Sequence, residues 1–239
     1  MHFRVRDVAP DILLFANLGV GQLARGYGAD ECLRAVAMAG AGALFLHLNP
    51  LQEALQAEGD TDFSGPLRRI GQLCRVLPVP VVAKEVGRGI SADVARALAD
   101  AGVAGIDVAG AGGTSWSEVE RHRADTPSRA RACAAFRAWG IPTAECLVAA
   151  RAALPGLPVF ASGGIRDGMD AAVALALGAD LAGLASAVLR PVTVSAEAAA
   201  LELGLVAREL RIAMFCAGAG DLVALRGVVS PRPDPASPR

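Results

Sequence analysis

The stretch PVPVVAKEVG, which runs from Pro78 to Gly87, decides the fold that the sequence predicts. Its apolar run is typical of a strand that is buried on both faces, as in a parallel sheet covered by helices. Lys84 follows this run, and it is the single lysine among the 23 Lys and Arg residues. A compact, rotatable ammonium binds its partners differently from a planar guanidinium. We therefore expect Lys84 at the C-terminal mouth of a buried strand, where that difference matters.

Similar short apolar runs recur along the chain, and a helical stretch follows each of them. They cover residues 12–19, 43–49, 79–87, 105–110, 140–143, 159–165 and 181–186. Repeated strand, loop and helix is typical of a (β/α)8 barrel, which needs roughly 250 residues. The 239-residue chain is close to that size. We predict an α/β fold of the (β/α)8 TIM-barrel type, with seven of the eight strands recognisable.

Two boundaries follow from composition. Residues 1–226 are expected to form the incomplete barrel domain, and residues 227–239 a disordered Pro-rich tail, because GVVSPRPDPASPR has four prolines and no apolar period. The longest apolar window, residues 171–189, is divided by Gly178, Asp180 and Gly183 into a helix and a strand, with Gly178 as a helix cap. We therefore expect no membrane span.

Overall composition excludes several classes of protein. Hydrophobic residues make up 53% and aromatic residues 4%, which favours a helix-covered parallel sheet over a β-sandwich. A net charge of −1 and scattered arginines do not fit a nucleic-acid binder. The five cysteines form no C-x-x-C pair, and no secretory signal precedes them. Reduced thiols in a cytoplasmic protein fit this pattern best.

Polar side chains gather at the predicted C-terminal ends of the strands, where the active site of a barrel lies. The two asparagines of the chain, Asn17 in FANLG and Asn49 in HLNP, both end predicted strands. His47 precedes Asn49 by two residues and so points the same way. Each residue alone could be a turn former or a satisfied core group, but their joint placement indicates a site.

Acidic and amide side chains follow directly. Gln52 and Glu53 precede the loop EGDTDF at residues 58–63. A carboxylate beside neutral amides suits Mg²⁺, a hard cation that keeps waters and shares ligands with substrate phosphates. A solvated loop is the alternative interpretation for Asp60 and Asp62, and it fits Glu53 less well.

Glycine-rich turns follow the later strands. The stretch DVAGAGGTSW, residues 107–116, lets backbone N–H groups approach a ligand, but it is not the G-x-G-x-x-G opening of a dinucleotide site. ASGGIR at residues 161–166 and the pair Ala185-Ser186 follow the last two predicted strands. Glycines and a hydroxyl at these places form the recurrent phosphate site of a barrel, so a phosphorylated cofactor is expected.

Taken together, these phrases resemble type 2 isopentenyl diphosphate isomerase, a flavin-dependent (β/α)8 enzyme. HLNPLQEALQAEGD is the specific part, and FANLG, PVPVVAKEVG, DVAGAGGTSW, WGIPT and FASGGIRDG follow the family's order. The resemblance implies that FMN is held by Asn17, Lys84, Thr114, Gly163, Gly164, Arg166, Ala185 and Ser186. It also implies that Gln52 faces the reacting carbons, that Glu53 carries Mg²⁺ to the diphosphate, and that His47 and Asn49 line the substrate pocket.

The implied reaction interconverts isopentenyl and dimethylallyl diphosphate in isoprenoid biosynthesis. Reduced FMN acts as the acid–base cofactor, and NAD(P)H serves only to reduce it. No side chain of the sequence is an obvious group for this proton transfer, which a cofactor would explain. Exposed sheet edges favour a homo-oligomer.

The family's first strand, with its Met-Thr-Gly-Gly turn, and its basic N-terminal segment have no counterpart in the sequence. We therefore expect weak FMN retention and negligible isomerase activity from the 239 residues. Two alternatives stay open. One is a non-catalytic truncated relic or partner-dependent subunit. The other is an FMN oxidoreductase of the hydroxy-acid oxidase type, which would need a histidine base near the late strands, whereas His2, His47 and His122 lie elsewhere.

Overall fold

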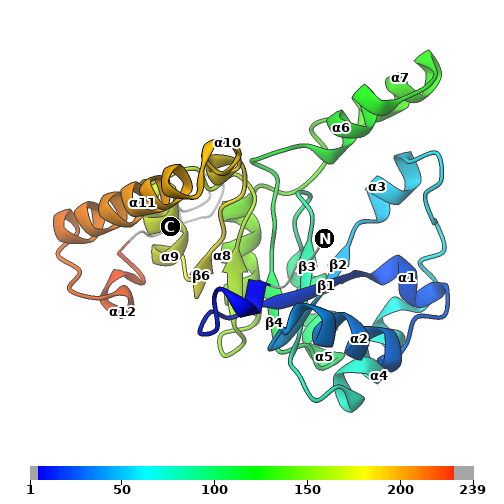
Figure 1. The fold of residues 1–239 in the computed structure, drawn as a ribbon, viewed down its shortest axis with the longest axis horizontal. Helices are drawn as coiled ribbons and strands as arrows, with labels where there is room; N and C mark the ends of the chain where they lie inside the picture. The colour runs from blue at the N-terminus through cyan, green and yellow to red at the C-terminus, as the bar shows by residue number, and fades with distance from the viewer. Residues whose placement is uncertain (1–4, 229–239) are drawn as a thin grey trace, which may run out of the picture.

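The chain folds as a parallel sheet wrapped by helices in a computed structural model that describes residues 5–228 (Figure 1). Six strands pair in chain order, and all five pairings are parallel. The strands are β1 (Phe15–Gly19), β2 (Ala43–Leu48), β3 (Val81–Glu85), β4 (Gly105–Asp107), β5 (Val159–Ala161) and β6 (Leu181–Ala182). Because a helical crossover carries the chain from each strand to its neighbour, the architecture is that of a barrel wall.

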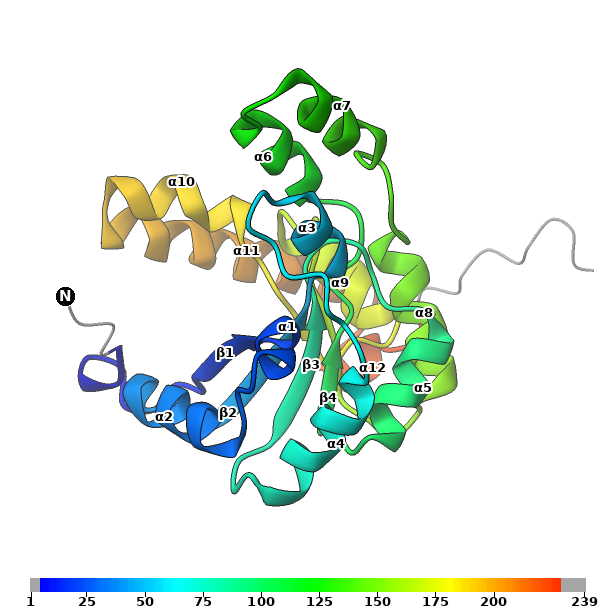
Figure 2. The same cartoon turned by 90° about the vertical axis from the view of Figure 1, so that its right-hand side faces the viewer.

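Helices fill the connections between these strands. After the 3-10 turn η1 (Val5–Asp7) they are α1 (Val20–Ala24), α2 (Ala29–Ala39), α3 (Pro50–Leu55), α4 (Pro66–Val76), α5 (Ala92–Asp100), α6 (Trp116–Arg123), α7 (Pro127–Ala135), α8 (Thr143–Ala153), α9 (Gly168–Ala176), α10 (Ser186–Val194), α11 (Ala196–Cys216) and α12 (Leu222–Leu225). Figure 2 shows α2, α4, α5 and α8 around the outside of the sheet, with α3, α6 and α7 above one end of it.

The core lies between the sheet and the outer helices. Leu44 and Leu46 of β2 are fully buried, whereas Phe45 between them is only half-buried. Since side chains alternate along a strand, one face of the sheet packs on the helices and the other faces the barrel interior. Gly178, at a φ of +108°, follows α9 and ends it, which confirms the predicted helix cap.

The predicted strand at residues 140–143 is wrong. These residues join the sheet only through an isolated bridge between Ala111 and Pro142, and Thr143 already begins α8. Proline has no N–H to donate to a ladder, and Gly140 adopts a φ of +138° that does not continue a strand. The segment instead pairs with loops, because Ile141 N donates to the carbonyl of Arg88.

The sheet is open. Among residues 5–228, β1 and β6 each pair on one side only, so the expected incomplete barrel has six recognisable strands where seven were predicted. Leu13 before β1 and Leu181 in β6 are 64% and 45% exposed at these edges. The predicted tail lies outside the described residues from position 229 onward, and no helix within the described part is long and apolar enough to span a membrane.

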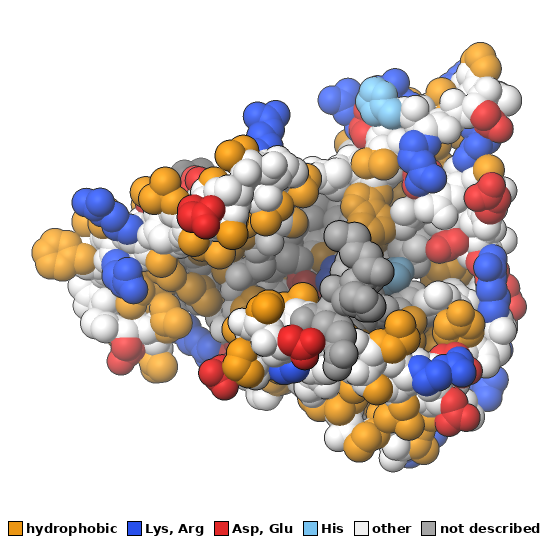
Figure 3. Space-filling view, in the orientation of Figure 1, with side chains coloured by type: hydrophobic (Ala, Val, Ile, Leu, Met, Phe, Trp, Pro, Cys, Tyr) orange, Lys and Arg blue, Asp and Glu red, His pale blue; other side chains and the backbone are white. Residues whose placement is uncertain are grey.

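Helices α10 and α11 project from the body on the side of β6 (Figure 1). Hydrophobic side chains gather along this projection (Figure 3). Val194 and Leu201 are 78% and 67% exposed, and Phe215 near the end of α11 is 85% exposed. This amount of exposed apolar surface is typical of a face that another element or subunit covers.

Candidate active site

A row of polar side chains crosses the inner face of the sheet at its C-terminal end. The strand register pairs His47 with Lys84 and Lys84 with Asp107, so the three stand side by side across β2, β3 and β4. Asn17 of β1 extends the row, because its Oδ1 lies 2.7 Å from His47 Nδ1. The structure therefore brings together three of the residues that the sequence analysis selected.

Aromatic rings support this row. Phe15 stacks on Phe45 with ring centroids 4.2 Å apart and meets Phe160 edge-on at 6.3 Å. The Nζ atom of Lys84 lies 5.9 Å from the centre of the Phe45 ring, within the range of a cation–π contact. A layer of aromatic side chains therefore lies next to the polar row on the inner face of the sheet.

His47 is held in one orientation by its neighbours. Since the amide Oδ1 of Asn17 can only accept, His47 donates through Nδ1, and Nε2 is left as an acceptor. Burial and the charge of Lys84 lower the pKa of His47, against a smaller opposing effect of Glu53. The ring is therefore neutral near pH 7 and presents an acceptor.

A second cluster forms where β2 runs into α3. Asn49 is 4% exposed, and its Nδ2 donates to Gln52 Oε1 at 3.1 Å and to Glu53 Oε1 at 2.8 Å. The other oxygen of Glu53 accepts the backbone N–H of Asp60 at 2.7 Å. Asn49 Oδ1 is buried and has no hydrogen-bond partner among the described residues. This oxygen is therefore available to a donor or cation that the protein itself does not supply.

Glu120 of α6 is a neighbour of this cluster that the sequence did not indicate. It is 3% exposed, and its Oε1 accepts from Gln52 Nε2 at 3.4 Å and from Gln56 Nε2 at 3.1 Å. The Arg123 guanidinium lies 3.3 Å from the same oxygen. With Asn49 on its oxygen and Glu120 on its nitrogen, the Gln52 amide has one preferred orientation.

A polar cavity of about 310 Å³ lies between these two groups of residues. It is lined by Gly19, Gly21, Gln22, Arg25, His47, Glu53, Gln56, Glu58 and Asp60. The described residues contain no cluster of three His, Cys, Asp or Glu side chains able to hold a metal ion. A cation beside Glu53 would therefore complete its shell with waters and substrate oxygens, as Mg²⁺ commonly does.

The two glycine-rich turns pack directly on each other. A Cβ on Gly163 would lie 2.2 Å from the carbonyl oxygen of Gly110, and one on Gly164 would lie 2.5 Å from the backbone of Gly112. Both Gly163 and Gly164 have positive φ, at +97° and +88°. These glycines are thus required by the contact between the ends of β4 and β5, in addition to the phosphate role that the sequence predicts for them.

The remaining predicted residues lie at the rim. Arg166 is exposed and pairs with Asp170 of α9 at 3.2 Å. Thr114 is exposed, with its carbonyl oxygen 3.3 Å from where a Cβ on Gly87 would stand. Ala185 and Ser186 are exposed at the start of α10. No hydrogen bond among the described residues joins these side chains to the row, so their grouping around one ligand stays a prediction.

Two buried carboxyl groups at the strand ends were also missed. Asp107 is 6% exposed and lies 4.0 Å from Lys84 Nζ, and burial raises its pKa while Lys84 and Ser162 oppose that change. Glu85 is 7% exposed and accepts the backbone N–H groups of Val86 and Arg88. Burial also raises the pKa of Glu85. A charged residue inside an apolar strand was the available signal for both.

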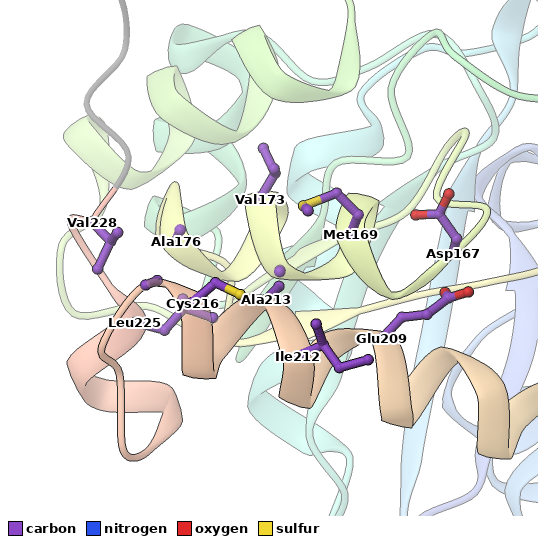
Figure 4. A pocket seen from close by; sticks show the side chains of 12 residues that line it. Asp167, Met169, Val173, Ala176, Glu209, Ile212, Ala213, Cys216, Leu225 and Val228 are labelled. Carbon is purple, nitrogen blue, oxygen red and sulfur yellow. The ribbon is translucent and has the colours of Figure 1, made fainter.

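A second, larger cavity lies away from the strand ends, between α9 and α11. It measures about 540 Å³ and is lined mainly by apolar side chains, including Met169 and Val173 of α9 and Ile212 of α11 (Figure 4). Asp167 and Glu209 lie at one end of it (Figure 4). Neither belongs to the row or to the cluster around Glu53.

The fold and the strand-end site define the class of protein. Residues 30–230 match the FMN-dependent dehydrogenase family, and the chain belongs to this family. The solved structure of a mandelate oxidase variant has the same fold, with a TM-score of 0.64 at 21% identity over 94% of this chain and 66% of that one. The predicted TIM-barrel type is therefore confirmed.

Closer relatives carry a more specific name. The isopentenyl-diphosphate delta-isomerase of Stutzerimonas stutzeri is 57% identical over 223 residues, 93% of this chain and 64% of that protein. The enzyme of the same name from Synechococcus sp. is 56% identical over 231 residues, 96% of this chain and 66% of that protein. The resemblance inferred from the sequence is confirmed, and the chain spans less than two thirds of the length of these relatives.

The described histidines bear on the oxidoreductase alternative. His122 lies on α6, where its Nε2 is 3.0 Å from Arg121 Nη2 at an exposed position, and His47 lies on β2. Within residues 5–228, therefore, no histidine stands at the ends of β4, β5 or β6. The histidine base that this alternative requires near the late strands is missing from the described part of the chain.

Proposed function

We propose that this chain carries the flavin-facing and substrate-facing strand ends of an isopentenyl-diphosphate delta-isomerase. The reaction would interconvert isopentenyl and dimethylallyl diphosphate, with FMN in its reduced state and Mg²⁺ on the diphosphate. The observation that carries the proposal is the junction of two groups of residues around one polar cavity. His47 belongs to the inner row, Glu53 belongs to the α3 cluster, and both line that cavity.

The residues at the strand ends fit an FMN group by their chemistry. Lys84 supplies a cation, Asn17 an exposed amide, and the turns at Gly112 and Gly163 supply backbone close to the sheet edge. Thr114, Gly164, Arg166, Ala185 and Ser186 would complete the binding surface, with Arg166 leaving Asp170 to do so. When bound, reduced FMN supplies an acid–base group able to exchange a proton with carbon.

Lys84 would bind an anionic group at the inner face. Its Nζ donates to the carbonyl of Glu85 at 2.8 Å, which leaves further N–H donors for a ligand. A cation about 4 Å from an anion stabilises it by about 4 kcal/mol at an effective dielectric of 20, before desolvation. Lys84 therefore has enough electrostatic strength to stabilise a negatively charged ring.

The cluster around α3 would position the substrate. Gln52, fixed by Asn49 and Glu120, would face the reacting carbons, while Glu53 would hold Mg²⁺ against the diphosphate. Neutral His47 would line the polar cavity, and the unpartnered Asn49 Oδ1 would face the neighbouring small pocket that Gln52 also lines. A double-bond shift needs a proton added at one carbon and removed from another, so a pocket that holds the substrate in one orientation favours it.

Three further features belong to this proposal. NAD(P)H would serve to reduce the flavin.

A homo-oligomer is supported by the open sheet edges and by the exposed apolar faces of α10 and α11. A cytoplasmic location is supported by the cysteines, since all five are unpaired thiols.

A chimera tests the proposed function. The part of the Stutzerimonas stutzeri relative that the match leaves uncovered would be fused to this chain, and conversion of isopentenyl diphosphate would be measured with FMN, a reductant and Mg²⁺. We expect turnover from the chimera and negligible turnover from the 239-residue chain. A folded chimera that binds FMN and does not isomerise the substrate would instead support the relic interpretation.

A further inference from the structure

Asp107 connects three strand ends of the site. Its Oδ1 accepts the Ser162 hydroxyl at 2.7 Å and the backbone N–H of Ala109 at 3.2 Å. Its Oδ2 lies 4.0 Å from Lys84 Nζ. The contacts therefore reach β3 on one side, the start of the β5 glycine turn on the other, and the glycine turn of its own strand.

Two of these contacts hold the backbone of the glycine-rich turns, which a ligand at the strand ends would contact. Ala109 is the only non-glycine residue with a positive φ among residues 5–228, at +35°, and its N–H is bound to Asp107. Ser162 directly precedes Gly163 and Gly164. Since an unusual backbone conformation persists only where the surroundings hold it, Asp107 supports the shape of both glycine turns.

Burial of Asp107 disfavours its ionised state, and the groups around it oppose this effect. Burial raises its pKa, and Lys84, Ser162 and the Ala109 N–H all act in the opposite direction. The other titratable groups at these strand ends are His47 on β2 and Glu85 on β3, and His47 is itself affected by the charge of Lys84. A buried carboxylate with a cation and two hydrogen-bond donors is a costly group to keep unless its position matters.

We propose that Asp107 is a positioning residue: its carboxylate holds the Lys84 ammonium and the two glycine turns in one fixed arrangement before any ligand binds. The residue acts through Lys84 and the turns and does not itself contact the ligand. The consequence for FMN rests on the proposed function, whereas the arrangement itself does not.

The lone lysine makes this proposal measurable without flavin. An acylating amine reagent is applied to the full chain at one mildly alkaline pH, and the rate at the Lys84 peptide is followed by mass spectrometry. Asp107→Asn should label Lys84 severalfold faster, because the amine loses the carboxylate 4.0 Å away that holds it in place on the inner face. Asp93→Asn is the matched control, because Asp93 is an exposed partner of Arg96 on α5. Equal Lys84 rates in the wild type and in folded Asp107→Asn would overturn the proposal.

A second measurement covers the case in which Asp107→Asn does not fold. Reductive methylation with a ¹³C label gives the wild-type chain one lysine resonance, whose shift is recorded as the pH is lowered. A step in this shift as Asp107 gains its proton supports the coupling, and a featureless curve in the folded protein contradicts it. Both measurements omit FMN, so an inactive chimera would remove the proposed function and leave this result standing.

Discussion

Two of the cavities among the described residues differ in size and in chemistry, and the larger of the two has the less polar lining. The cavity at the strand ends is the smaller, at about 310 Å³, and is lined by His47, Glu53 and other polar groups. The cavity between α9 and α11 is larger, at about 540 Å³, and its lining is mainly apolar. Polar and charged side chains that converge on one hollow are typical of a binding or catalytic site, whereas the larger cavity lies between the apolar faces of two helices.

The largest expected effect is on the free energy of unfolding, and it comes from a substitution in the apolar cavity. Leu225, 3% exposed, lines the apolar cavity. Leu225→Ala should lower the free energy of unfolding by about 3 kcal/mol, since a buried leucine loses its transfer energy and leaves a void. Urea unfolding measures the change, and Val223→Ala, at a position 77% exposed, is the control with little expected effect. An undiminished stability would mean that Leu225 is not part of a packed interface.

Glu53→Gln, in the polar cavity, should affect activity rather than stability. In the active chimera we expect Glu53→Gln to slow Mg²⁺-dependent turnover, because the transition state loses about 2 kcal/mol of stabilisation, the scale of a charge-assisted contact. The affinity for FMN should change little. Steady-state kinetics at several Mg²⁺ concentrations and an FMN titration give the two values. Asp62→Asn in the neighbouring loop is the control. Equal losses of turnover and FMN affinity would assign Glu53 to holding Asn49 and the loop at Asp60.

Lys84→Arg tests whether charge alone suffices at the inner face. FMN affinity should fall about tenfold, or about 1.4 kcal/mol, because a guanidinium cannot take the place of the compact ammonium between Asp107 and the Phe45 ring. Fluorescence titration of the chimera with FMN measures the change. Arg96→Lys on the exposed face of α5 should leave affinity unaltered. Retained affinity in Lys84→Arg would show that any cation serves there.

The smallest expected effect is a pH dependence of opposite sign in the two kinds of environment. The folded-state pKa of Asp107 is raised by burial, so the stability linked to its proton is present at low pH and is lost as the pH rises through that pKa. The pKa of exposed Asp62 is lowered by its hydrogen bonds to Ser64, so its contribution is lost as the pH falls. As the pH is lowered from neutral, the free energy of unfolding of the wild type should therefore rise relative to that of Asp107→Asn. It should fall relative to that of Asp62→Asn.

What the sequence predicts well is whatever depends on local periodicity. The apolar runs predicted that Lys84 stands near the C-terminal end of one buried strand and His47 near the end of another, and the structure places them on β3 and β2. The apolar segment around Ile141 misled for the same reason, because its composition suits a strand while Pro142 cannot complete a ladder.

Contacts between distant segments lay beyond the sequence. Asp107 and Ser162 are 55 positions apart, and Gln52 and Glu120 are 68 positions apart, so nothing local indicates that they meet. The cofactor role of Arg166 stays a prediction, and in the structure its guanidinium lies 3.2 Å from the carboxylate of Asp170. The position of a long side chain depends on which partner is present, and a sequence pattern does not specify that.

The order of the strands has a consequence for folding. Each strand pairs with the one that precedes it in the chain, so the sheet contacts form between neighbouring βα units rather than between distant parts. Pairing consecutive strands keeps each loop to the length of one crossover, so the loop-closure entropy for each added strand is that of a single βα unit. On the ribosome, β1 and β2 can pair before β5 and β6 have been synthesised, and the barrel wall can grow one unit at a time.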